Sequence, residues 1–221
     1  MLDDFASRLK QHWRVACFST DATEAACGKD GFGARQLQGM HERGHSRPRM
    51  WAQYAENHAG ACIVLDKRTI TSAFEELGGR LGLQVFSGPI RYQNTPVVPN
   101  LEIGPFMANM NEVRRYGLEE AVRRHGLRFW RELFLTKNND WSAEREFRYL
   151  LHGSHSGKVF VDVARCIRGV LVGPSFPDRL LERARHHAVE AGIEIARMDW
   201  KNGIPQIRLM TRLASGNWID F

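Results

Sequence analysis

The chain has 221 residues, of which 43% are hydrophobic, and its 31 basic and 25 acidic side chains give a formal net charge of +6. This size and composition fit one domain over residues 1–221 with an ordinary core, and they exclude a low-complexity chain. No apolar run approaches the roughly 20 residues of a membrane-spanning helix, and the N-terminus lacks the apolar segment of a signal peptide. We therefore expect a cytoplasmic protein.

Hydrophobic periodicity predicts helices and strands in irregular order. In chain order we expect a helix over 2–12, a strand over Val15–Ser19, a polar loop over Thr20–Pro48, a helix over 50–57, a strand over Ala61–Asp66 and a helix over 67–78. Next we expect a strand over Val85–Tyr92 with a bulge or break at Gly88 and Pro89, a loop over 94–105, and one or two helices over 106–137 interrupted near Gly117 and Gly126. We then expect strands over Trp141–Leu151, Lys158–Val163 and Arg168–Val172, a helix over Pro177–Ala191, and strands over Ile193–Met198 and Gln206–Leu213. This order predicts an α+β fold, with a mixed, mostly antiparallel twisted sheet and flanking helices.

Four cysteines, Cys17, Cys27, Cys62 and Cys166, lie far apart in the sequence. No C-x-x-C pair suggests zinc or redox chemistry. Because free cysteine is among the most buried residue types, we expect buried thiols.

The segment His41-Glu42-Arg43-Gly44-His45 spells the H-E-x-x-H of zinc peptidases. That motif works when an α-helix places both imidazoles on one face. Here glycines and polar residues surround it, so a polar loop is the favoured interpretation. A zinc hydrolase through His41, Glu42 and His45 stays a distant alternative, and no metal is predicted.

Trp51, Tyr54, Ala55 and His58 follow at helical spacing. Such a stripe is commonly the buried face of a short helix. The functional alternative gives Tyr54 a stacking role toward a planar ligand and His58 a polar contact at the helix end.

Glu144, Glu146 and Arg148 share one face of the strand predicted over Trp141–Leu151. Charged residues on an edge strand often only prevent aggregation. Alternatively, two carboxylates face a cleft, where one stabilises positive charge developing on a substrate and the other orients or accepts a proton.

A basic helical region carries Arg114, Arg115, Arg123, Arg124, Arg128 and Arg131. An excess of basic over acidic side chains attracts polyanions, although a solvated basic surface is the simpler interpretation. This region supports an alternative function as a nucleic-acid-binding module. P-loop, dinucleotide-fold and serine-hydrolase motifs are absent from the sequence.

Four blocks together resemble the uncharacterised bacterial domain family numbered 2971. They are Cys17-Phe18-Ser19, the M-W-x-x-Y-A-x-x-H-x-G segment from Met50 to Gly60, the K-x-x-x-W-x-x-E-x-E-x-R segment from Lys137 to Arg148, and the strand ending at Gly173. The resemblance covers about residues 15–175, and a C-terminal helix and strands follow over 177–213.

Two departures from the family pattern matter. Family members carry a further stretch before the CFS block, so we expect a missing N-terminal segment or a partner chain to complete the family site. Gln53 stands where the family tends to have His, which leaves an amide that does not titrate near neutral pH.

The order of elements is also similar to that of ADP-ribosyltransferases, several of which are bacterial toxins or phage-defence effectors. This likeness implies NAD as substrate and a macromolecular acceptor. It implies that Tyr54 stacks on nicotinamide, that Glu146 holds the ribose hydroxyl, and that Glu144 positions the acceptor. The remaining NAD-binding residues that it implies are Trp51, Gln53, His58, Arg148 and Arg49.

Overall fold

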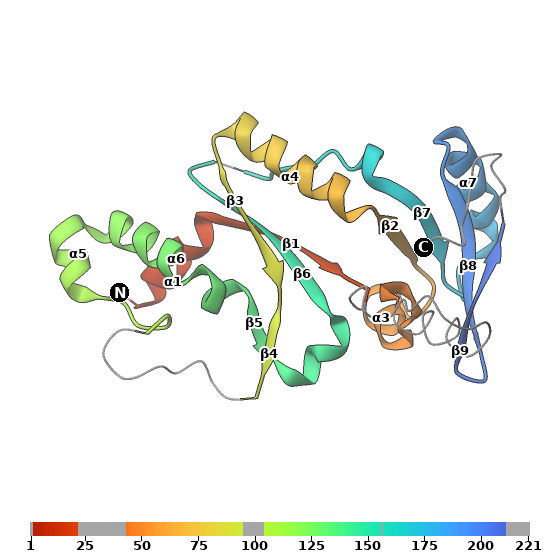
Figure 1. Cartoon of the computed structure of the whole chain (residues 1–221), viewed down its shortest axis with the longest axis horizontal. Helices are drawn as coiled ribbons and strands as arrows, with labels where there is room; N and C mark the ends of the chain where they lie inside the picture. Colours follow the sequence, from red (N-terminus) through yellow and green to blue (C-terminus); the bar gives the residue numbers. More distant parts are fainter. Residues whose placement is uncertain (1, 22–42, 95–103, 156, 211–221) are drawn as a thin grey trace, which may run out of the picture. The chain divides into compact units, whose positions relative to one another are not determined.

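The computed structural model describes residues 2–21, 43–94, 104–155 and 157–210 (Figure 1). Its contacts divide the chain into two compact units, each built from two separate stretches. The first unit contains Met1–Thr20 and Phe74–Val161, and the second contains Asp21–Ala73 and Asp162–Phe221. Helices combine with mostly antiparallel strands, so the predicted α+β fold is confirmed. The prediction of one domain stays a prediction.

The first unit is built on a three-stranded antiparallel sheet in the order β1-β6-β3. Its strands are β1 (Trp13–Ser19), β6 (Glu146–His152) and β3 (Gln84–Pro89). A parallel pair joins β4 (Arg91–Gln93) to β5 (Thr136–Asn138). The helices of this unit are α1 (Leu2–Gln11), α5 (Met110–Tyr116), α6 (Leu118–Phe134) and the C-terminal part of α4 (Lys67–Leu81), and a 3₁₀ helix, η3 (Asn139–Glu144), precedes β6.

The two faces of this sheet are covered differently because side chains alternate along a strand. On one face, Trp13 and Leu150 belong to a core that also contains Trp130 of α6 and Leu135, the residue after α6. On the other face, the ring of Tyr149 stacks on Phe74 of α4 with 4.3 Å between centroids. Burial of aromatic rings on both faces fixes the register of β6.

Gly126 does not interrupt the helix, contrary to the sequence-based prediction. It lies inside α6, where a Cβ atom would stand 2.8 Å from Nε1 of Trp13 and 2.9 Å from Cδ1 of Leu9. The glycine therefore permits close packing of α6 on the N-terminal elements. The predicted break at Gly117 is confirmed, since this residue has φ of 80° between α5 and α6. A kink instead occurs at Phe129.

Two strand predictions are wrong: one strand is shorter than predicted, and the other does not form. The strand predicted over Trp141–Leu151 begins only at Glu146, because residues up to Glu144 form η3 and Arg145 is left-handed with φ of 43°. Residues Lys158–Val163 form no strand.

The second unit contains a four-stranded mixed sheet in the order β2-β7-β8-β9. Its strands are β2 (Ala61–Leu65), β7 (Ile167–Val172), β8 (Glu194–Lys201) and β9 (Ile204–Leu209), with α7 (Asp178–Glu190) between the parallel neighbours β7 and β8. The unit also contains α3 (Pro48–Tyr54) and the 3₁₀ helices η2 (Gly44–Ser46) and η4 (Ala164–Cys166). Most of the polar loop predicted over Thr20–Pro48 lies outside the described residues.

Burial of the cysteines agrees only in part with the prediction. Cys166 is buried and Cys62 is half-buried, but Cys17 is exposed because it lies on the edge strand β1, and Cys27 lies outside the described residues. Within the described part of the chain, no helix has the length and apolar character needed to span a bilayer.

Candidate functional site

One face of the first unit's sheet changes from apolar to charged along its strands. Its apolar end carries Trp13 and Leu150, beneath Trp130 of α6. Its other end carries Cys17 and Ser19 of β1, which pair in register with Arg148 and Glu146 of β6. The charged end therefore begins where the helical cover of the sheet stops, near Phe134, the last residue of α6.

Lys137 joins the two carboxylates. Its Nζ lies 2.5 Å from Oε2 of Glu144 and 3.4 Å from Oε2 of Glu146. The glutamate side chains are only 5% and 8% exposed, so these charges are compensated inside the protein. Trp141 covers the ammonium group, with its ring centroid 4.8 Å from Nζ.

Arg148 binds Glu146 through two hydrogen bonds. Its Nε donates to Oε1 at 2.7 Å and its Nη2 donates to Oε2 at 3.1 Å. The same guanidinium donates from Nη1 to the carbonyl oxygen of Phe134 at 2.6 Å. A cation at the end of a helix satisfies an orphan carbonyl and opposes the negative end of the helix dipole.

Three further side chains complete this network. The Tyr92 hydroxyl accepts a hydrogen bond from the Glu146 backbone N–H at 2.8 Å. The Ser19 hydroxyl donates to the carbonyl oxygen of Glu144 at 2.7 Å. The Cys17 thiol is hydrogen-bonded to Glu146, and its partial burial followed by this contact raises its pKa to about 11. The thiol therefore stays protonated at neutral pH and is a weak donor.

The network keeps its charges at neutral pH. Burial raises the pKa of Glu146, but the hydrogen bonds from Arg148 and Cys17 and the charges of Arg148 and Lys137 lower it more. Burial lowers the pKa of Lys137, but its contacts with Glu144 and Glu146 raise it more. Glu146 is thus held as a carboxylate and Lys137 as an ammonium ion.

The local fold explains why the two glutamates meet at Lys137 without lying on one strand. Glu144 ends η3, and the left-handed Arg145 reverses the chain before β6 begins with Glu146. The side chain of Asn138 caps η3 by accepting from the backbone N–H of Asp140. The short strand β5 places Lys137 beside this turn. The predicted convergence of the two carboxylates is found, but the predicted single strand is wrong.

An ionised carboxylate held by fixed cations can stabilise positive charge that develops on a substrate. The same contacts can equally serve stability alone, since buried ion pairs with complete hydrogen bonding are found in many cores. The exposed Cys17 and Ser19 beside the buried glutamates provide an outward-facing edge to the network.

In the second unit, Trp51, Ala55 and His58 of the M-W-x-x-Y-A-x-x-H-x-G segment have packing roles. Trp51 is buried with Ala55 against Leu171, Ala196 and Met198, and its Nε1 donates to the carbonyl oxygen of His45 at 2.7 Å. The interpretation of this stripe as a buried helix face is confirmed for Trp51 and Ala55.

The predicted helix over 50–57 ends early, because Glu56, Asn57 and His58 all have positive φ, between 47° and 69°. This left-handed turn brings the His58 carbonyl against β7, where a Cβ on Gly173 would lie 2.0 Å from it. The His58 ring packs edge-on against Trp200, with 5.6 Å between centroids. Gly173, the residue after β7, must therefore be a glycine because the His58 turn packs directly against it.

Tyr54, Gln53 and Arg49 are the predicted ligand-binding residues that α3 exposes. The Tyr54 side chain is 62% exposed, unlike its buried neighbour Trp51. These residues belong to the second unit and the glutamates to the first. The predicted common hollow for Tyr54 and Glu146 stays a prediction.

The zinc alternative lacks the helix that it needs in the described part of its motif. Arg43 has an extended backbone and Gly44–Ser46 is a 3₁₀ helix, while His41 and Glu42 lie outside the described residues. Burial lowers the pKa of His45 to about 4. Among the residues that the structure describes, no group of three metal-ligating side chains converges.

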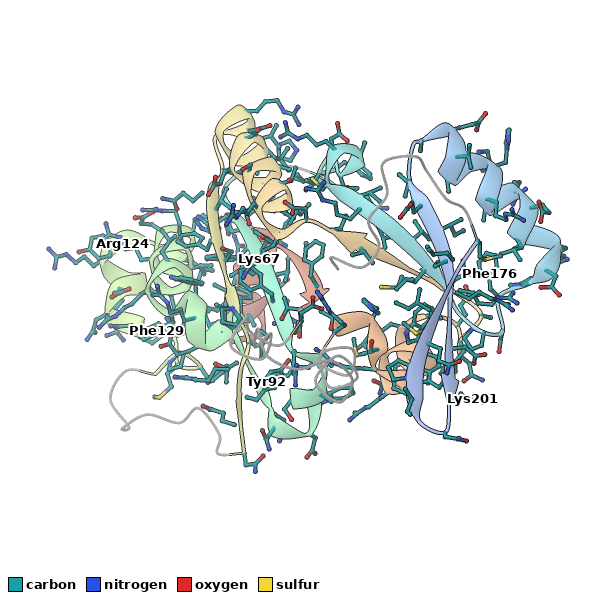
Figure 2. All side chains as sticks on the ribbon, turned by 45° about the vertical axis from the view of Figure 1, so that its right-hand side comes forward. Lys67, Tyr92, Arg124, Phe129, Phe176 and Lys201 are labelled. Atoms are coloured by element: carbon teal, nitrogen blue, oxygen red, sulfur yellow. The ribbon has the colours of Figure 1, made fainter. Side chains whose placement is uncertain are left out.

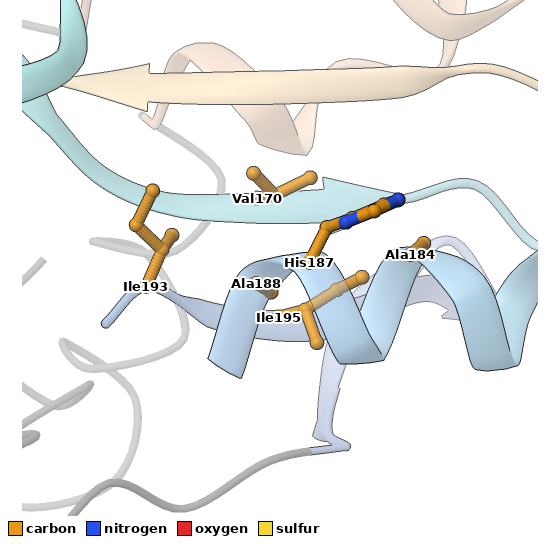
Figure 3. Close-up of a pocket in the computed structure, with 6 residues that line it drawn as sticks. All are labelled: Val170, Ala184, His187, Ala188, Ile193 and Ile195. Atoms are coloured by element: carbon orange, nitrogen blue, oxygen red, sulfur yellow. The ribbon is translucent and has the colours of Figure 1, made fainter. Parts of the chain in front are cut away.

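A small apolar hollow lies in the second unit between α7 and the sheet (Figure 3). Its lining residues are Val170, Ala184, His187, Ala188, Ile193 and Ile195. Only His187 offers a polar group here, so the hollow provides no set of converging polar groups for a specific ligand.

Sequence reasoning missed Lys137, Cys17, Ser19 and Tyr92 as members of the glutamate network. Lys137, Cys17 and Ser19 belong to the quoted sequence blocks, so their co-occurrence with Glu144 and Glu146 was the available signal. Tyr92 carried no such signal, since it lies on β4 and reaches the Glu146 backbone only through the tertiary fold.

Comparisons with known proteins found a match to a protein family. No curated protein and no solved structure matches the chain. Residues 50–149 match the model of one family, and this range includes Trp51, Lys137, Glu144, Glu146 and Arg148 but not Cys17 or Ser19. The resemblance predicted from the sequence is confirmed over residues 50–149, which match the family described as "Protein of unknown function (DUF2971)".

Proposed function

We propose that the protein is a transferase that uses NAD as its substrate and transfers ADP-ribose to a macromolecule, with Glu146 as the central carboxylate. The observation that carries this proposal is the buried Glu146, which two cations hold ionised and fixed in position. A preorganised carboxylate of this kind acts on positive charge that develops during a reaction.

The proposed reaction breaks the bond between the ribose C1′ and the nicotinamide nitrogen. Nicotinamide leaves with the bonding electron pair, and the ribose acquires oxocarbenium character. A nucleophile of the acceptor then attacks C1′ and loses its proton to a base. In this scheme the negative charge of Glu146 stabilises the ribosyl cation, and Glu144 positions the acceptor.

We propose that the ribose enters beside Cys17. Arg148 contacts both carboxylate oxygens of Glu146 and Lys137 contacts Oε2, whereas the thiol of Cys17 is a weak donor on an exposed residue. A ribose hydroxyl is a stronger donor than a thiol. We therefore place the ribose hydroxyl where the thiol now contacts Glu146.

The remaining parts of the proposal concern residues of the second unit and the biological setting. Stacking of Tyr54 on nicotinamide and binding of the pyrophosphate by Arg49 are proposed from the likeness to ADP-ribosyltransferases. A role as a bacterial toxin or phage-defence effector in the cytoplasm belongs to the same proposal.

The test is nicotinamide release from NAD, with cell extract supplied as a source of acceptors. Wild type should release nicotinamide, and Glu146→Gln should lose about two orders of magnitude in rate, a typical cost of removing one electrostatic contact to a transition state. Cys17→Ala should retain activity, because the ribose hydroxyl replaces the thiol in the complex.

Glu120→Gln is the matched control. Glu120 also bridges two basic side chains, Arg123 and Arg124, but it lies on α6 outside the network. Its activity should equal that of wild type. Absence of release from folded wild type overturns the transferase proposal, and equal release from folded Glu146→Gln removes this carboxylate from the reaction.

A further inference from the structure

A cationic surface on the helical part of the first unit combines guanidinium groups with aromatic rings. Figure 2 labels two of its residues, Arg124 and Phe129, at the edge of this helical part. We call it the arginine–aromatic surface, and its members are Arg115, Tyr116, Arg124, Arg128, Phe129 and Arg131.

Two arginines lie on one tyrosine at the junction of α5 and α6. The Cζ atom of Arg124 is 4.0 Å from the centroid of the Tyr116 ring, and that of Arg115 is 5.1 Å from it. Gly117, with its positive φ, turns the chain between these helices and so allows the contact between α5 and α6. The tyrosine itself is 37% exposed.

Glu120 fixes the orientation of Arg124 without covering it. Its carboxylate accepts from Nε of Arg124 at 2.8 Å, and it also accepts two hydrogen bonds from Arg123. The side chains of both arginines are still nearly half exposed, at 46% and 47%. A guanidinium has five N–H donors, so Arg124 keeps donors for a further acceptor.

Arg128 and Arg131 continue the surface along α6. Arg128 follows Arg124 by four residues and so lies on the same helical face, and Arg131 follows just beyond the kink at Phe129. The Cζ of Arg128 lies 5.2 Å from the Phe129 centroid, and that of Arg131 lies 4.3 Å from the Trp130 centroid. Both arginines are exposed.

The charge of this surface is not neutralised within the protein. In the described part of the chain, no acidic side chain pairs with Arg115, Arg128 or Arg131. Glu119, on the same helix, instead pairs with Arg8 and His12 of the N-terminal segment. The surface therefore presents unpaired guanidinium groups that are held by rings.

We infer that the arginine–aromatic surface binds single-stranded nucleic acid. Guanidinium groups bind phosphates through paired donors, and guanidinium planes and aromatic rings also stack on unpaired bases. A duplex keeps its bases stacked on each other, so their faces are not available for stacking on these rings. The alternation of arginine with aromatic residues favours a strand whose bases are free.

The test is fluorescence anisotropy of the full chain with a labelled single-stranded RNA of mixed sequence and with a duplex of the same sequence. The single strand should bind more tightly. The double variant Arg128→Gln/Arg131→Gln should weaken binding and reduce the slope of log K against log salt by about 1.4, at about 0.7 per phosphate contact.

Tyr116→Ala tests the stacking part of the inference. It should weaken binding of the single strand about tenfold, within the range for loss of one stacked base, and leave the salt slope unchanged. The matched charge control is Arg179→Gln/Arg183→Gln, which removes two exposed arginines from one face of α7 in the second unit. This control should bind as wild type does.

Three outcomes overturn the inference: no binding of the single strand at low salt, an equal loss of affinity in both double variants, or equal affinity for single strand and duplex. The second would show a diffuse response to net charge, and the third would show contact with phosphates alone. None of these measurements involves NAD, so this inference stands or fails separately from the proposed transferase activity.

Discussion

The guanidinium of Arg148 donates two hydrogen bonds to the carboxylate of Glu146 and a third to the carbonyl oxygen of Phe134, where α6 ends. One side chain thus links the central strand of the sheet to the helix that covers its core. The K-x-x-x-W-x-x-E-x-E-x-R segment therefore fixes the position of two elements, whatever reaction it also serves.

Removal of Arg148 should destabilise the protein strongly. Arg148→Ala leaves the buried Glu146 without its two-pronged partner, and loss of one member of a buried pair costs about 3 kcal/mol or more. Urea denaturation followed by tryptophan fluorescence measures the change. Arg8→Ala, which removes an exposed ion-pair partner of Asp4 and Glu119, should cost much less. Equal losses would contradict the structural role of Arg148.

Two glycine substitutions in helices of the first unit should have opposite effects. In Gly126→Ala the new methyl group meets Trp13 and Leu9 at under 3 Å, so overpacking should cost about 1–3 kcal/mol. In Gly79→Ala of α4 no atom lies within 4 Å of the new Cβ, so the better helix propensity of alanine should stabilise by about 0.5 kcal/mol. Thermal unfolding of both variants checks the pair; stabilisation by Gly126→Ala would refute the packing argument.

His152 should make the protein less stable in mild acid. Burial, followed by the charges of His12 and Arg123, lowers its pKa to about 4. The unfolded chain therefore binds a proton near the ordinary pKa of about 6.5, before the folded chain does, and each pH unit below this costs up to about 1.4 kcal/mol.

The variant His152→Gln removes this titration. Its unfolding free energy should fall less than that of wild type between pH 7 and 5, whereas above pH 7 the two profiles should run parallel. Urea midpoints measured across this range check the prediction. Profiles that stay parallel below pH 6 would mean that His152 does not titrate in the way its burial implies.

Trp51 and Tyr54 should respond differently to truncation although they lie in one short helix. Trp51→Ala empties a buried site and should cost about 3–5 kcal/mol. Tyr54→Ala removes an exposed side chain and should change stability little. If Tyr54 also stacks on nicotinamide, Tyr54→Ala should release less nicotinamide while its melting temperature stays that of wild type. Normal release would contradict the stacking role of Tyr54.

Sequence reasoning succeeded where one periodicity dominated a segment. The strand β2 and the helix α7 follow closely from apolar runs and from the proline at the helix start. It failed at the strand predicted over Trp141–Leu151, where the alternation that starts at Glu144 concealed the end of η3 and the left-handed Arg145. It also failed at Gly126, because a glycine that permits helix packing has the same letter as one that ends a helix.

The sequence by itself determined the α+β class and most of the elements, because local periodicity carries that information. Its resemblance to a family also placed Glu144, Glu146 and Lys137 in one pattern. Only the tertiary structure decided that Lys137 bridges both glutamates, that Arg148 secures one of them to the end of α6, and that Cys17 lies beside them. These contacts depend on strand register and helix packing, which join residues far apart in the chain and leave no local periodicity.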